Sequence, residues 1–180
     1  MIARLLVFAV ALIVPGTVSA AETAASFHEL LVRYRCEVLD RLDRIYDSYA
    51  AGDPADVQDT FLIIYRLDRP QDYVQCVFDA PTKMYCEAAS GFYDEAPPAV
   101  RSRHLSPTVI AALGRLGFST DDSAGNFEIS FGVGDPPDLN RIAELMLRAM
   151  HDGYGVRANV KLGFNAPYAP RPTRKCIPVS

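Results

Sequence analysis

The fold is built around one stretch, Tyr73-Val-Gln-Cys-Val-Phe-Asp-Ala-Pro-Thr-Lys-Met-Tyr-Cys-Glu-Ala-Ala89. Two short apolar runs flank a turn-forming cluster at 79–82, and this pattern predicts a β-hairpin. Because side chains alternate along a strand, Gln75 and Glu87 point to one face. The other face carries six apolar residues: Val74, Cys76, Phe78, Met84, Cys86 and Ala88. The hairpin therefore predicts an antiparallel sheet with one covered face.

The segments around the hairpin supply the helices and the remaining strands. Apolar residues at three- and four-residue spacing predict helices over 26–50, 106–117 and 138–152, with Ser26, Ser106 and Asp138 as capping residues. Alternation predicts strands over 60–67 and 125–133, and a last edge strand over 156–162. The order α-β-β-β-α-β-α-(β) indicates an α+β fold, an antiparallel sheet of four to five strands with helices packed on one face.

The N-terminus has the features of a signal peptide. Arg4 supplies a positive charge, the apolar run at 5–14 is too short to span a bilayer, and Val18-Ser19-Ala20 is a small-x-small cleavage site. We therefore expect a signal peptide over 1–20, one domain over 21–165 and a proline-rich tail over 166–180. The expected location is the periplasm or the medium, with no membrane span after cleavage.

Four cysteines, Cys36, Cys76, Cys86 and Cys176, indicate two disulfides in an oxidising compartment. Three pairings are possible. Cys76–Cys86 is favoured because the two residues lie opposite each other if the hairpin turns near Pro81, which leaves Cys36–Cys176 and ties the tail through Cys176. The cysteines are too far apart in sequence for the paired ligands of a zinc site, so no metal and no cofactor are expected.

Charge and motifs exclude several functions. The net charge is −4 and no basic run is present, which argues against a nucleic-acid partner. His28, His104 and His151 lie in no recognisable catalytic motif, and no phosphate loop or nucleophile elbow is present. An enzyme using His104, or Glu87 with Asp94, is an alternative that we weigh below a binding role.

Several short stretches resemble the type III secretion chaperone-like superfamily, specifically the TY-Chap type of peptide-binding chaperone domain. The resemblance covers about 58–155 and depends on the order and spacing of its stretches. These are Tyr73-Val-Gln75, Glu87-Ala-Ala-Ser90, Leu105-Ser106, Leu113-Gly-Arg-Leu-Gly-Phe118, Asn126-Phe127 and Met146-Leu-Arg-Ala-Met-His-Asp-Gly-Tyr-Gly-Val156. The resemblance implies a non-enzymatic domain that binds a protein or peptide partner, often as a homodimer.

The sequence thus predicts an exported protein- or peptide-binding module. The sheet edge or the groove between helix and sheet would accept an extended peptide. The candidate contact residues lie on the outer face of the hairpin: Tyr73, Gln75, Tyr85 and Glu87. A small periplasmic enzyme of unknown reaction and a purely structural envelope protein remain the alternatives.

Overall fold

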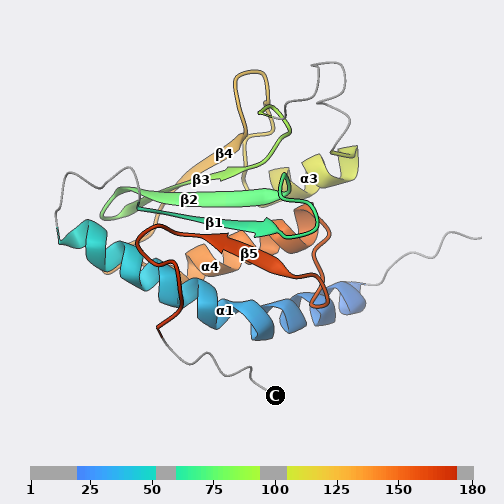
Figure 1. The fold of residues 1–180 in the computed structure, drawn as a ribbon. Helices are drawn as coiled ribbons and strands as arrows, with labels where there is room; N and C mark the ends of the chain where they lie inside the picture. The colour runs from blue at the N-terminus through green and yellow to red at the C-terminus, as the bar shows by residue number, and fades with distance from the viewer. Residues whose placement is uncertain (1–19, 52–59, 94–104, 174–180) are drawn as a thin grey trace, which may run out of the picture.

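The computed structural model describes residues 20–51, 60–93 and 105–173 (Figure 1). A five-stranded sheet lies over the long helix α1 (Ala20–Ala50) and the shorter α4 (Leu139–Arg148), and α3 (Pro107–Arg115) lies at one end. Helices α1 and α4 contact each other, α1 packs on strand β1, and α4 packs on strand β2. The predicted α+β fold with helices on one face is confirmed.

All neighbouring strands of the sheet are antiparallel, in the order β4-β3-β2-β1-β5. The first three strands form the expected meander, and β4 and β5 add to its two sides. Their bounds are β1 (Phe61–Arg66), β2 (Tyr73–Ala80), β3 (Lys83–Ala88), β4 (Phe127–Gly132) and β5 (Leu162–Asn165).

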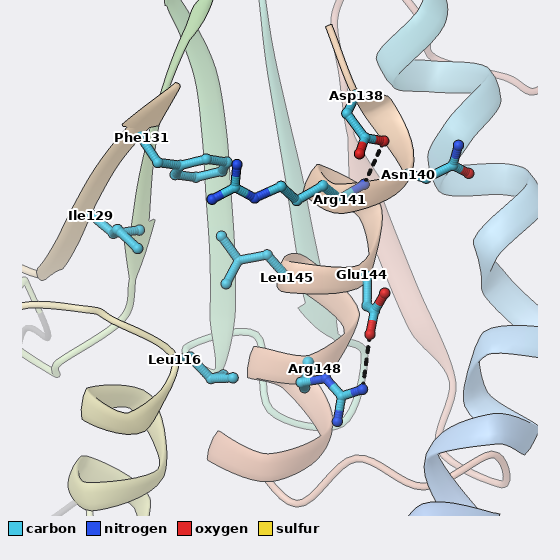
Figure 2. Close-up of a pocket in the computed structure, with 9 residues that line it drawn as sticks. All are labelled: Leu116, Ile129, Phe131, Asp138, Asn140, Arg141, Glu144, Leu145 and Arg148. Carbon is cyan, nitrogen blue, oxygen red and sulfur yellow. Dashed lines mark hydrogen bonds and ion pairs between the residues drawn. The ribbon is translucent and has the colours of Figure 1, made fainter. Parts of the chain in front are cut away.

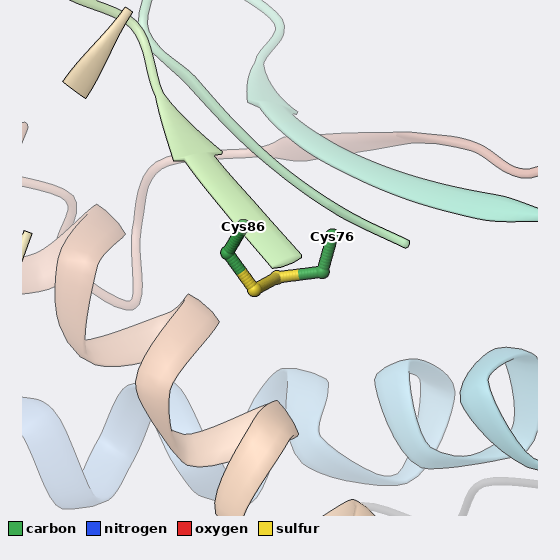
Figure 3. Close-up of a disulfide and its surroundings, with 2 residues drawn as sticks. All are labelled: Cys76 and Cys86. Carbon is green, nitrogen blue, oxygen red and sulfur yellow. A yellow bond between two sulfur atoms is a disulfide. The ribbon is translucent and has the colours of Figure 1, made fainter. Parts of the chain in front are cut away.

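The hairpin β2–β3 has the predicted register and the predicted disulfide. Cys76 lies opposite Cys86, with Cα atoms 4.1 Å apart, and their sulfur atoms are bonded on the helix side of the sheet (Figure 3). The six predicted inward residues are all buried. The other expected pair, Cys36–Cys176, includes a residue outside the described part of the chain and stays a prediction.

Capping explains where α3 and α4 begin. Ser106 Oγ accepts a hydrogen bond from Val109 N, and Asp138 Oδ1 accepts one from Arg141 N. The prediction for the first helix was wrong at its start, because α1 begins at Ala20 and Ser26 lies inside it. Ser26 Oγ instead donates to the carbonyl of Thr23 within the helix. A π-helical turn, η2 (Ala149–Gly153), extends α4.

The last strand was placed wrongly, since it covers Leu162–Asn165 and not 156–162. Side chains from α1 form hydrogen bonds with the backbone of the segment that leads into this strand. Tyr34 Oη donates to Val160 O and accepts from Leu162 N, and Arg33 donates to Ala158 O. Because α1 satisfies these groups, residues 157–160 turn and do not pair with β1.

Asp40 and Arg44 of α1 face the C-terminal segment. Asp40 is 1% exposed and accepts hydrogen bonds from both N and Oγ1 of Thr173. Arg44 donates to the carbonyls of Tyr168 and Arg171. The segment over 166–173 therefore lies along α1, as Figure 1 shows. The predicted signal peptide, apart from Ala20, lies outside the described residues. None of the described helices combines the length and apolar character needed to cross a membrane.

Candidate functional site

The outer face of the sheet is the face that no described helix covers. The structure brings all four predicted contact residues together there. Tyr73 and Gln75 lie on β2, Tyr85 and Glu87 lie on β3, and Gln75 is directly opposite Glu87. All four side chains are partly exposed. Their inward neighbours are buried against the helices, so the alternation of the strands itself sets this face apart.

A hollow of about 510 Å³ opens on this face, over β1, β2 and β5. Tyr65 forms part of its wall, and its ring lies against the backbone of Gly163, where a side chain would overlap it. The hollow is large enough for one or two side chains of a ligand. The lining residues are Ile63, Tyr65, Pro70, Tyr73, Gln75, Phe164 and Asn165.

A hydrogen-bond chain holds Tyr73 at the rim of the hollow. Its hydroxyl accepts from Asn126 Nδ2 at 2.7 Å, and Asn126 Oδ1 accepts from Ser90 N. Asn126 is 7% exposed. A buried amide with both ends paired fixes its partners in place. Tyr73 and Asn126 belong to two of the separate sequence stretches that carry the resemblance, and the fold brings them into contact.

An acidic pair lies beside the hollow on the same face. Glu87 on β3 is directly opposite Glu128 on β4. The Tyr85 hydroxyl is 2.8 Å from Glu128 Oε2 and 3.1 Å from Glu87 Oε1. Burial, and then the hydrogen bond to Glu128, raise the pKa of Tyr85 above its ordinary value, so the phenol is a neutral donor at physiological pH. The sequence predicted Tyr85 and Glu87 here and missed Glu128.

A family model described as "T3SS (YopN, CesT) and YbjN peptide-binding chaperone 3", TY-Chap3, matches residues 40–167. The chain belongs to the TY-Chap3 family. The match runs from the middle of α1 to just past β5, so it includes the whole sheet and both sides of the hollow. No curated protein and no solved structure matched the chain.

The TY-Chap3 domain has a second hollow, a groove of about 500 Å³ on the helix side of β4 (Figure 2). Leu145 of α4 and Phe131 of β4 point into it, and Arg141 covers the Phe131 ring at 5.1 Å. The sequence predicted the strand that carries Ile129 and Phe131 but not this groove. The lining residues are Leu116, Ile129, Phe131, Asp138, Asn140, Arg141, Glu144, Leu145 and Arg148.

A Ser-His-Asp arrangement joins α1 to η2, and sequence reasoning missed it. Ser26 Oγ is 2.7 Å from His151 Nε2, and His151 Nδ1 is 2.6 Å from Asp152 Oδ1. The imidazole is fully buried and its ring edge meets Phe27. Neither of the two hollows described above is lined by these residues. We assign the arrangement to the attachment of α1 to the end of α4.

The enzymatic alternative rests on residues of which the structure describes Glu87 alone. His104 and Asp94 lie outside the described residues, and Glu87 hydrogen-bonds to Tyr85. His28 is exposed on α1. Within the described ranges, no group of three or more histidine, cysteine or acidic residues is arranged to hold a metal ion.

Proposed function

We propose that this TY-Chap3 domain is an exported peptide-binding module that uses the outer face of its sheet. The observation that carries the proposal is the hollow of about 510 Å³ on the face that no described helix covers, walled by the aromatic rings of Tyr65 and Tyr73. Aromatic side chains supply large contact area at low entropic cost, as binding surfaces require. The predicted signal peptide supports export.

Family membership supports the peptide ligand, because the family description names peptide-binding chaperones. An extended peptide lying on a sheet presents alternate side chains to it, and a hollow of this size accepts one or two of them. On the covered face most apolar residues form the core with α1 and α4, and in the groove beside β4 the Phe131 ring is covered by Arg141.

A display library of random twelve-residue peptides, selected against the mature protein, tests this function. Two matched variants locate the site: Ile63→Gln places an amide in the outer hollow, and Leu145→Gln places one in the groove of Figure 2. Both residues are partly exposed aliphatic side chains, so the two changes are chemically alike. Circular dichroism and thermal unfolding show that each variant is folded.

The proposal expects selected peptides to bind the wild type and Leu145→Gln equally, and to bind Ile63→Gln at least tenfold more weakly. A loss confined to Leu145→Gln would move the site to the groove. Failure to select any peptide would contradict the peptide-binding function itself.

A further inference from the structure

One row of side chains crosses the whole outer face in register. Each residue is the direct cross-strand partner of the next: Asn165 on β5, Ile63 on β1, Gln75 on β2, Glu87 on β3 and Glu128 on β4. The row starts in the hollow and ends at the acidic pair. Four strand spacings of about 4.8 Å make it roughly 19 Å long.

At the acidic end of the row, one hydroxyl lies between two carboxylates. Like charges directly opposite each other on a sheet are destabilising. The Tyr85 hydroxyl lies within hydrogen-bond distance of both carboxylates but has a single proton, so it donates to one of them at a time. A cation arriving from solution would offset the repulsion and supply further donors.

The face itself does not provide that cation. Among the outward-pointing residues of the five strands, the one basic side chain is Lys83, and it forms an ion pair with Asp79 at 2.6 Å. The charge available to a ligand is therefore negative, and it lies next to an apolar hollow. A second copy of the chain docked by this face would bring the same arrangement and no unpaired base.

We infer that the outer face selects a polypeptide segment in which a lysine or arginine follows or precedes an apolar side chain by four residues, a spacing that keeps both side chains on the same side of an extended chain. The apolar side chain fills the hollow beside Ile63, and the base lies between Glu87 and Glu128. The two places are two to three strand spacings apart, about 10–14 Å, and an extended chain rises about 3.3 Å per residue. This inference rests on the proposed function and adds the chemistry of its ligand.

The test uses the peptides selected from the twelve-residue library. Their sequences should be enriched in lysine and arginine over aspartate and glutamate, at four positions from an apolar residue. Glu87→Gln/Glu128→Gln keeps the shape of the pair and removes its charge. It should weaken binding of the best peptide by about tenfold. The control Glu29→Gln/Asp47→Asn makes the same change of net charge on exposed positions of α1, away from this face, and should bind as the wild type does.

A double-mutant cycle separates a direct contact from a general effect of charge. Replacing the peptide's base by glutamine should cost about tenfold against the wild type and almost nothing against Glu87→Gln/Glu128→Gln. Peptides that bind through Ile63 but show no basic enrichment and no coupling to the glutamates would overturn the inference and leave the proposed function standing. Failure to select any peptide would overturn both.

Discussion

At the scale of single residues, the shape of the outer hollow depends on Gly163. A Cβ atom at this position would overlap the Tyr65 ring, which lies on the backbone of β5. We predict that Gly163→Ala pushes the ring into the hollow. Because the ring is at the surface and has room to move, the free energy of unfolding should fall by only about 1 kcal/mol. Peptide affinity should fall by about fivefold or more, close to 1 kcal/mol.

Gly132 supplies the matched control for this change. Like Gly163 it lies in an edge strand of the sheet, and a Cβ atom there would lie 3.9 Å from Thr82 O, an ordinary contact. Titration of a labelled peptide measures the peptide affinity, and urea denaturation measures the free energy of unfolding. Equal affinity for Gly163→Ala and Gly132→Ala would show that the ligand does not use the hollow.

Tyr154 predicts how stability depends on alkaline pH. Its hydroxyl donates to Ala89 O at 2.7 Å, and burial, followed by the nearby charge of Asp72, raises its pKa above the ordinary value of 10. The unfolded chain releases this proton near pH 10, whereas the folded chain holds it. The contribution of this raised pKa to the free energy of unfolding is therefore complete below pH 10 and is lost as the pH rises further.

Urea denaturation between pH 7 and pH 11 measures this effect. Tyr154→Phe should cost about 1 kcal/mol at pH 7, from the lost hydrogen bond, and should lose less stability than the wild type above pH 10. Tyr93 is 66% exposed, so Tyr93→Phe should follow the wild-type curve. An unchanged alkaline slope in Tyr154→Phe would contradict the assignment.

At the scale of elements, α1 holds the C-terminal segment as well as the sheet. Asp40 accepts two hydrogen bonds from Thr173, so Asp40→Asn removes the charge that strengthens them. We predict faster amide hydrogen exchange at Ala169, Arg171 and Thr173, the residues of 169–173 that carry an amide hydrogen, corresponding to a local loss of about 1–3 kcal/mol. Asp47, exposed on the same helix, gives the control Asp47→Asn. Exchange that is the same in both variants would show that Asp40 does not hold the segment.

Comparison of the strands with the sequence shows which patterns predicted secondary structure correctly. The alternation of β2 and β3 predicted the covered face, the register at Cys76 and Cys86 and the disulfide, because strand period and turn position fix all three together. The same alternation over 156–162 misled, since the backbone there is bound by Tyr34 and Arg33 of α1. Such long-range side-chain bonds leave no periodic signal in the segment that they shape.

At the scale of the whole molecule, the sequence predicted which residues share the face of the proposed site, but only some of those that the structure places there. Tyr73, Gln75, Tyr85 and Glu87 follow from the hairpin alone. Glu128 and Asn165 come from strands far away in the sequence, and only the strand order brings them into the same row. The groove beside Leu145 depends on how far α4 covers β4, which local periodicity does not report.

The central claim is that peptides bind the outer face of the sheet. The most direct measurement is the set of backbone and side-chain NMR shift changes when a selected twelve-residue peptide is titrated into the mature protein. We predict the largest changes at Ile63, Tyr65 and Gln75, which line or flank the outer hollow. Changes concentrated at Leu116 and Leu145, in the groove on the other side of the sheet, would contradict the claim.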